Sequence, residues 1–125
     1  MTHHLADTVI RTPIDSLTKS DVPNPATDVC DLTLLPIGAY HRAWPDIHMN
    51  PEEAVRAHLD VAESDSGLLV PIHWATFRLA PHPWSEPAER LLTAADQAGI
   101  RVVVPKPGQR VDPGMPSTFD PWWRL

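Results

Sequence analysis

Leu32-Thr-Leu-Leu-Pro-Ile-Gly38, Asn50-Pro-Glu-Glu53 and Leu68-Leu-Val-Pro-Ile-His73 are the stretches that decide the fold of this chain. The first and third are continuous apolar runs, which are typical of strands buried on both faces of a sheet. In the second, Asn50 can cap a helix, Pro51 suits its first position, and two acidic residues favour its positive end. The sequence therefore predicts a strand–helix–strand unit.

The first predicted helix carries one apolar stripe. Val55, Leu59 and Ala62 recur at helical spacing and are predicted to face a core. His58 lies inside the same helix and is predicted to be a residue at the boundary of that stripe. Glu52 and Glu53 are better explained by helix capping than by acid–base catalysis.

A second helix and a third strand follow. Glu86-Pro-Ala-Glu89 primes the helix, Gly99 ends it, and Arg101-Val-Val-Val104 is the strand. The order β-α-β-α-β with short connections predicts an α/β fold with parallel strands and helices packed on the sheet. The apolar face of this second helix consists of Ala88, Leu91, Leu92 and Ala95.

The chain divides into three parts by composition. Residues 1–30 form a polar N-terminal segment, predicted to be a weak helix over 1–20 followed by a connector. Residues 31–108 carry the strand and helix signals. Residues 109–125 form a tail rich in proline and tryptophan, and we expect Trp122 and Trp123 to clamp it onto the body.

Composition excludes several classes of function. The formal charge of −6 and the scattered Lys and Arg residues argue against a nucleic-acid partner. No apolar run approaches the ~20 residues that span a bilayer, so no integral membrane segment is expected. The N-terminus lacks a signal-peptide pattern, and Cys30 is the single cysteine, so a cytoplasmic location is expected. Cys30 is predicted to be a small buried residue rather than a nucleophile.

Two histidines lie at element junctions. His73 directly follows a predicted strand, where a neutral imidazole can bind a metal or move a proton. The alternative is a histidine that caps the strand by bonding a backbone carbonyl, and for one histidine alone this is the commoner case. His48 precedes the helix cap Asn50 by two residues, where it is either a substrate contact or general acid, or an exposed loop histidine.

Three blocks together resemble the metallo-β-lactamase-fold zinc hydrolases, in the N-acyl-phosphatidylethanolamine phospholipase D-like branch. They are Asp31-Leu-Thr-Leu-Leu-Pro-Ile-Gly-Ala-Tyr40, His48-Met-Asn-Pro-Glu-Glu-Ala-Val55 and Pro71-Ile-His-Trp-Ala-Thr-Phe-Arg-Leu79. The Val-Val-Val-Pro-x-Pro-Gly run ending at Gly108 is also similar to that branch, so the resemblance covers residues 31–108. It implies a hydrolase of phosphodiester or similar ester bonds that uses zinc.

The resemblance also implies roles for particular residues. His73 falls on a zinc ligand of the family, and His48 falls on a histidine that lies near the bound phosphodiester, which implies a substrate or proton-transfer role. Ala75 stands where the family usually has glycine. Arg42-Ala-Trp44 replaces Pro-Arg-Trp in a slightly shorter loop, which leaves the identity of the substrate open.

The family's other metal ligands have no intact counterpart in this sequence. The family builds a two-zinc site from His-x-His-x-Asp-His, a later histidine and a bridging aspartate, and residues 4–17 resemble the first of these only faintly. The expectation is therefore a truncated C-terminal half of the αβ sandwich with an irregular N-terminal segment and an incomplete metal site.

The missing metal ligands leave three interpretations of the chain open. One is a zinc-dependent hydrolase. The second is a catalytically inert remnant that acts as a binding or self-associating domain, because half a sandwich leaves a sheet face exposed and favours a homo-oligomer. The third is a misplaced start of the reading frame. Whether the chain is an enzyme stays open at this point.

Overall fold

The computed structural model describes residues 10–11, 30–62, 67–114 and 120–124. Their elements are strands β1 (Ile10–Arg11), β2 (Leu32–Pro36), β3 (Leu68–Ile72) and β4 (Arg101–Val102), and helices α2 (Pro51–Ala62) and α3 (Glu86–Ala98). The α/β fold predicted from the sequence is confirmed.

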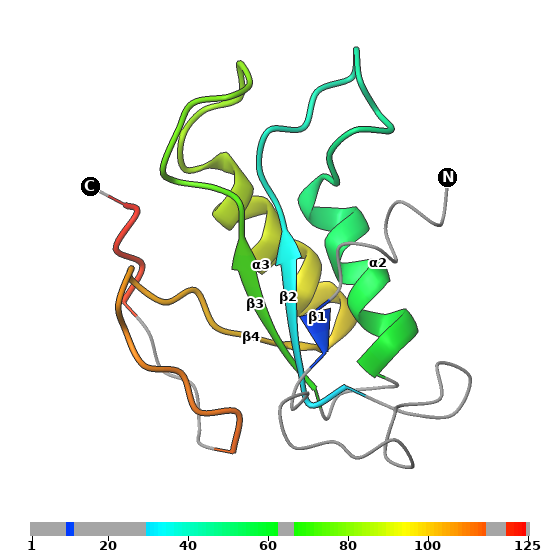
Figure 1. The fold of residues 1–125 in the computed structure, drawn as a ribbon, viewed down its shortest axis with the longest axis vertical. Coiled ribbons are helices and arrows are strands. Elements are labelled where there is room, and N and C mark those ends of the chain that lie inside the picture. Colours follow the sequence, from blue (N-terminus) through cyan, green and yellow to red (C-terminus); the bar gives the residue numbers. More distant parts are fainter. Residues whose placement is uncertain (1–9, 12–29, 63–66, 115–119, 125) are drawn as a thin grey trace.

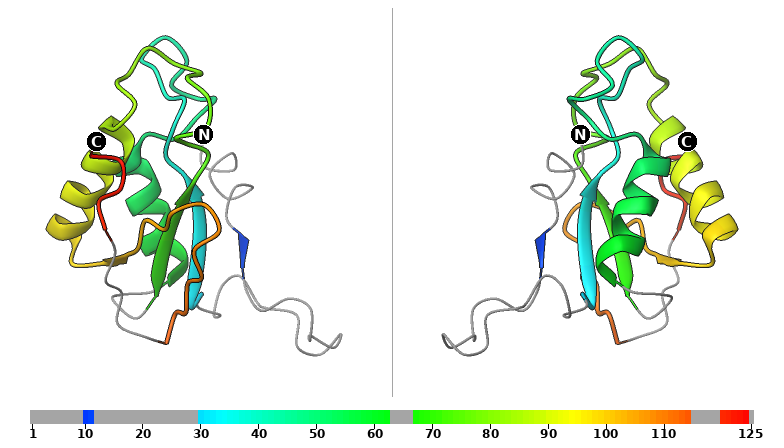
Figure 2. Two further views of the ribbon diagram at one scale, coloured as in Figure 1. Left: turned by 90° about the vertical axis from the view of Figure 1, so that its left-hand side faces the viewer. Right: turned by 90° about the vertical axis from the view of Figure 1, so that its right-hand side faces the viewer.

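A small sheet with strand order β1-β2-β3-β4 forms the middle of the molecule (Figure 1). β2, β3 and β4 run parallel, with Leu32 opposite Leu68 and Leu68 opposite Arg101. Each parallel pair is joined through a helix, and both helices lie on the same face of the sheet (Figure 2). β2 and β3 therefore end at one edge, where α2 and α3 begin (Figure 1).

β1 differs from the sequence prediction. Ile10 and Arg11 pair with Leu34 and Thr33 in an antiparallel register, so the weak helix predicted over 1–20 is wrong for these two residues. The rest of that helix and its connector lie outside the described residues. Two residues are too few to show the alternation of apolar and polar side chains that identifies a strand in a sequence. The pairing partner also lies far along the chain, so no local signal indicates this strand.

Both predicted helices are confirmed, and their ends follow local chemistry. Asn50 and Glu53 form a reciprocal capping box: the Glu53 N–H donates to Asn50 Oδ1 at 2.9 Å, and the Asn50 N–H donates to Glu53 Oε2 at 3.0 Å. Gly99 ends α3 in the left-handed conformation, with φ 68°. The third strand is shorter than predicted, since β4 ends at Val102.

The main core lies between the helices and the sheet. It contains Leu35, Ile37, Val55, Leu91 and Trp123, all buried. On the opposite face of the sheet a smaller cluster of Leu68, Val70 and Val103 packs against Val111, with Leu32 and Leu34 half-buried. β2 is therefore less buried on the face opposite the helices than the sequence predicted. Residues 103–111 cover part of that face, which had been expected to be exposed.

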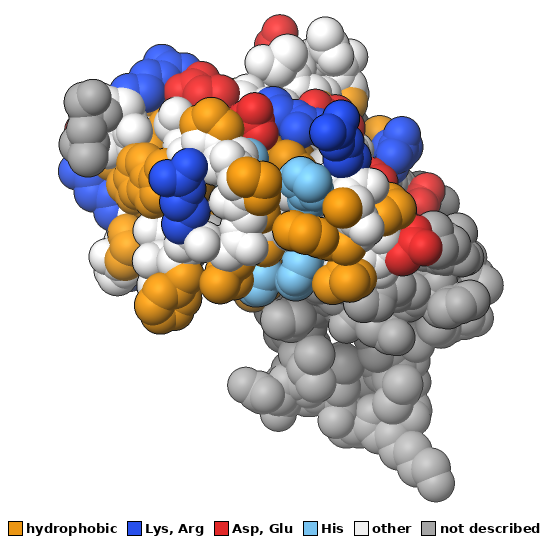
Figure 3. Space-filling view, turned by 90° about the horizontal axis from the view of Figure 1, so that it is seen from above, with side chains coloured by type: hydrophobic (Ala, Val, Ile, Leu, Met, Phe, Trp, Pro, Cys, Tyr) orange, Lys and Arg blue, Asp and Glu red, His pale blue; other side chains and the backbone are white. Residues whose placement is uncertain are grey.

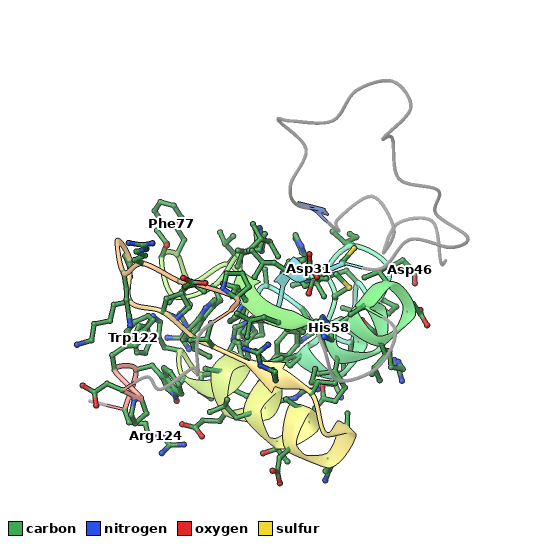
Figure 4. The ribbon with its side chains drawn as sticks, turned by 90° about the horizontal axis from the view of Figure 1, so that it is seen from below. Asp31, Asp46, His58, Phe77, Trp122 and Arg124 are labelled. Atoms are coloured by element: carbon green, nitrogen blue, oxygen red, sulfur yellow. The ribbon has the colours of Figure 1, made fainter. Side chains whose placement is uncertain are left out.

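The apolar stripe of α2 is shifted from its predicted position. Val55 and Ala62 are buried as expected, but Leu59 is 37% exposed and His58 is completely buried. The prediction that His58 is a boundary residue is wrong. His58 lies between α2 and the sheet (Figure 4), where Thr33 gives its ring a polar partner at 2.7 Å.

Among the described residues, no helix is long and apolar enough to cross a membrane.

Candidate functional site

The structure brings the two predicted site histidines together. His48 comes from the loop before α2, and His73 is the first residue after β3. Their rings stack with centroids 4.9 Å apart and an interplanar angle of 26°. His73 is exposed and His48 is half-buried. Two imidazole rings from separate loops thus lie side by side at the edge of the sheet where the parallel strands end.

The backbone at this edge is unusual. Ala39, His73 and Ala75 have positive φ angles of 64°, 59° and 67°, although none of them is glycine. Such residues cost of order 1–3 kcal/mol each and cluster at functional sites. Ala75 is also the position where the sequence resemblance expected glycine, and its left-handed conformation explains why glycine suits that position.

Gly38 lets the two strand-end loops approach closely. A Cβ atom on Gly38 would lie 2.4 Å from the backbone oxygen of His73 and 3.0 Å from the Cβ of Trp74. The Ile37 N–H also donates to the Ile72 carbonyl at 3.1 Å, so the pairing of β2 and β3 continues up to these loops. The position of His73 is therefore set by backbone contact with the end of β2.

A pocket of about 260 Å³ opens beside His73. Trp74, Phe77, Leu79 and Trp84 give it an apolar lining, and Arg78 adds a cation. His48 stacks on His73 but does not line this pocket. Seen from above, histidine side chains lie among hydrophobic ones near the middle of the face (Figure 3). Among the residues that the structure describes, the lining consists of Gly38, Ala39, His73, Trp74, Ala75, Thr76, Phe77, Arg78, Leu79, His82, Trp84 and Pro87.

One side of the pocket rests on a tryptophan cluster, which consists of Trp74, Trp84, Trp122 and Trp123. Trp74 is 5.3 Å from Trp122 and 6.0 Å from Trp84 and from Trp123, measured between ring centroids. The C-terminal segment thus contacts the residue that follows His73.

Glu89 on α3 anchors that C-terminal segment. Its carboxylate accepts a hydrogen bond from Trp123 Nε1 at 2.7 Å and two from Arg124, at 2.6 and 2.9 Å. These bonds, from Arg124 first and Trp123 second, lower the pKa of Glu89 below its ordinary value. Trp122 Nε1 donates to the Val104 carbonyl at 3.0 Å. The predicted clamping of the tail by Trp122 and Trp123 is confirmed.

Charged side chains tie the N-termini of α2 and α3 to the β2 loop. Arg90 makes a bidentate ion pair with Glu52 at 3.0 and 2.6 Å, and its guanidinium lies 4.8 Å from the ring centre of Tyr40. The Tyr40 hydroxyl donates to Glu86. Burial, followed by this bond, raises the pKa of Tyr40 well above its ordinary value.

His58 belongs to the core rather than to the site. Its Nδ1 faces the Thr33 hydroxyl, while its buried Nε2 has no hydrogen-bond partner among the described residues. Burial lowers the pKa of His58, and the backbone of Gly67 raises it by less. The ring is therefore neutral at neutral pH. Cys30 is buried as predicted.

Two supporting residues were not found from the sequence. His82 Nε2 accepts a hydrogen bond from the Ala39 N–H, and Trp44 Nε1 donates one to the Ala39 carbonyl. The sequence offered no signal for these contacts, because each joins a side chain to a backbone group in another part of the loop region.

The described residues do not form a complete metal site. Within 30–62, 67–114 and 120–124, no three His, Cys, Asp or Glu side chains lie close enough to hold one ion. Catalytic zinc usually takes three protein ligands. The described part of the chain therefore does not fit zinc without further ligands.

Comparison with known proteins gives the chain relatives of two kinds. Uncharacterised proteins of Mycobacterium bovis and Mycobacterium tuberculosis are 74% identical to it over 95 residues, which cover 76% of this chain and 26% of theirs. The chain thus spans about a quarter of the length of these relatives. It is also 32% identical, over 74 residues, to the yeast mitochondrial N-acyl-phosphatidylethanolamine-hydrolyzing phospholipase D, covering 58% of this chain and 15% of that protein.

The sequence model of the beta-lactamase superfamily domain matches residues 12–74, which is just over half of the chain. The match includes β2, α2, β3 and His73. The parallel sheet with two helices on one face agrees with part of a metallo-β-lactamase-like fold. This chain belongs to the beta-lactamase superfamily domain family.

Proposed function

We propose that this chain carries part of a zinc-dependent hydrolase site, in which His73 binds the metal and His48 contacts the substrate or transfers a proton. The observation that carries the proposal is the stacking of the two rings, 4.9 Å apart, at the edge where β2 and β3 end. Loops at that edge are the usual location of sites in α/β folds.

The substrate class that we propose is a phosphodiester or related ester with an apolar substituent. Arg78 is the cation that lines the pocket, and no carboxylate stands among the described residues that line it. An anionic group beside an apolar chain matches this lining. The yeast relative is an N-acyl-phosphatidylethanolamine-hydrolyzing phospholipase D, which supports a lipid phosphodiester.

The remaining metal ligands have to come from outside the described ranges or from a second chain. With those ligands in place, zinc would supply an activated water molecule and polarisation of the scissile group. His73 would supply one imidazole ligand for the metal. His48, stacked alongside, can hydrogen-bond a substrate oxygen.

We also propose a cytoplasmic location. The chain's single cysteine, and hence the absence of an internal disulfide, supports it.

The test is metal content per chain, measured by elemental mass spectrometry on tag-free protein after gel filtration. We expect bound zinc in the wild type, loss of zinc in His73→Ala, and retention in His41→Ala, whose ring contacts Trp44 instead. Hydrolysis of bis(4-nitrophenyl) phosphate should then fall in His48→Ala with zinc retained. Wild-type protein without zinc would contradict the proposal for this chain.

A second candidate function is a catalytically inert, self-associating domain. Phe77 and Leu79 are 75% and 60% exposed, and Phe77 points away from the body of the molecule (Figure 4). Exposed apolar groups of this kind favour association. Sedimentation velocity should then show a dimer that Phe77→Ser dissociates and Leu59→Ser does not. A monomer at all concentrations would contradict this function.

A further inference from the structure

Ala39 is held by side chains from two other parts of the loop region. It lies just beyond β2 in a left-handed conformation, with φ 64°. Its N–H donates to His82 Nε2 at 3.1 Å, and its carbonyl accepts from Trp44 Nε1 at 2.9 Å. Both polar groups of one strained peptide residue are thus satisfied by side chains rather than by the sheet.

The position of Ala39 determines the surroundings of His73. Gly38, its neighbour, approaches the His73 backbone so closely that a Cβ atom would lie 2.4 Å from the His73 oxygen. Ala39, Gly38 and His73 also line the same pocket. A displacement of Ala39 would therefore move the surface against which His73 rests.

His82 is itself fixed in orientation. Its ring stacks on Tyr40, with centroids 4.4 Å apart and an interplanar angle of 18°. Its Nδ1 lies 3.1 Å from the Pro83 carbonyl oxygen. Because Nε2 accepts from the Ala39 N–H, the ring proton must be on Nδ1, where it donates to Pro83. Only the neutral Nδ1-protonated ring makes both bonds.

We propose that His82 is a positioning residue for the His73 site, holding Ala39 and hence the end of β2 against His73 through its Nε2 lone pair. The proposal rests on the proposed function in that it takes the His48–His73 pair to be the reactive part of the site. His82 acts on the site through the backbone of Ala39.

The wild-type protein provides the first test. In the ¹⁵N-labelled chain of residues 1–125 at neutral pH, NMR should detect a coupling across the Ala39 N–H···Nε2 bond of His82. The imidazole ¹⁵N shifts of His82 should show a proton on Nδ1 and none on Nε2. Absence of the coupling, or a proton on Nε2, would overturn the proposal without any variant.

Two substitutions separate positioning from simple packing. His82→Gln keeps an acceptor near the position of Nε2, whereas His82→Phe keeps the stacking on Tyr40 and loses the acceptor. In His82→Phe we expect the Ala39 amide to exchange roughly tenfold faster, as for one lost hydrogen bond. The NOE between the rings of His48 and His73 should also weaken. His82→Gln should restore both towards wild-type values.

The outcomes distinguish this proposal from the proposed function. Unchanged Ala39 exchange and an unchanged His48–His73 NOE in folded His82→Phe would overturn the positioning role. A loss of folding in His82→Phe leaves the wild-type coupling and His82→Gln to decide it. Zinc content is measured separately: absence of zinc together with the predicted His82 results would remove the hydrolase proposal and keep the positioning role.

Discussion

His48 and His73 stack ring on ring at 4.9 Å, although one precedes α2 and the other follows β3. Two features bring them together. The capping box of Asn50 and Glu53 fixes where α2 begins, and the close backbone approach at Gly38 fixes where His73 lies. The geometry of the pair therefore depends on residues outside it, and substitutions at those residues can test it.

Gly38→Ala should destabilise the fold and disturb this pair. The new Cβ would meet the His73 oxygen at 2.4 Å, so the backbone must shift. We expect a loss of about 1–3 kcal/mol in the free energy of unfolding, measured by urea denaturation. Gly114→Ala is the matched control, since its nearest contact would be 3.4 Å from Asp112 Oδ1. Equal effects of the two substitutions would refute the close approach.

Ala75→Gly should stabilise the protein. Ala75 has φ 67°, and a left-handed conformation costs an L-residue roughly 1–2 kcal/mol that glycine does not lose. After allowing for the greater freedom of glycine in the unfolded chain, we expect a net gain of about 0.5–1 kcal/mol. In α3 the same change, Ala94→Gly, should destabilise by a similar amount. Thermal denaturation of both variants checks the opposite signs.

Thr33→Val should destabilise the core between α2 and the sheet. It removes the hydroxyl that faces His58 Nδ1 at 2.7 Å, leaving the buried ring without this partner. We expect a loss of about 1–3 kcal/mol by chemical denaturation. Replacing both residues, in Thr33→Val with His58→Leu, should recover most of that loss, because no buried polar group then remains unpaired. A double variant no more stable than Thr33→Val alone would contradict this account.

Tyr40 should resist ionisation in the folded protein. It is the single tyrosine of the chain, so the ultraviolet absorbance of phenolate reports on it alone. Its raised pKa means that the folded state keeps the proton when an unfolded chain, at about pH 10, loses it. Stability should therefore decline as the pH rises above that value. An ordinary titration curve in folded protein would show that the bond to Glu86 and the burial of Tyr40 are absent.

Glu89→Gln should loosen the C-terminal segment and remove an acid-sensitive step. The lowered pKa of Glu89 means that its contribution is complete above the ordinary value of about 4.3 and is lost as the pH falls through the lower folded value. Tryptophan fluorescence of the wild type should change over that range, and Glu89→Gln should already show the acid spectrum at neutral pH. Asp96→Gln, also on α3, serves as the control.

The elements of this fold were predictable because their signals are local. The apolar run from Leu32, the cap at Asn50 and the stop at Gly99 each act through neighbours in sequence. The two candidate site histidines could be named for the same reason, since each adjoins such a signal. Their stacking could not, because it depends on how two loops meet.

The missed features depend on contacts that no local sequence pattern encodes, and most of these contacts join residues far apart in the chain. His58 shares its helix with Leu59, and only the packing of α2 on Thr33 decides which of the two is buried. The strand at Ile10–Arg11 exists through its pairing with β2. His82 and Trp44 reach a backbone group that no sequence pattern identifies as strained.

The tryptophan cluster gives this protein an optical readout of its own site. Four of its five tryptophans lie in the cluster, with neighbouring indole rings 5.3 to 6.0 Å apart. Indoles at that separation couple their strong electronic transitions and give a pair of bands of opposite sign in the far-ultraviolet circular dichroism spectrum. Because Trp74 follows His73 directly, the sign and splitting of those bands will report on the loop that carries His73, without any label attached to the protein.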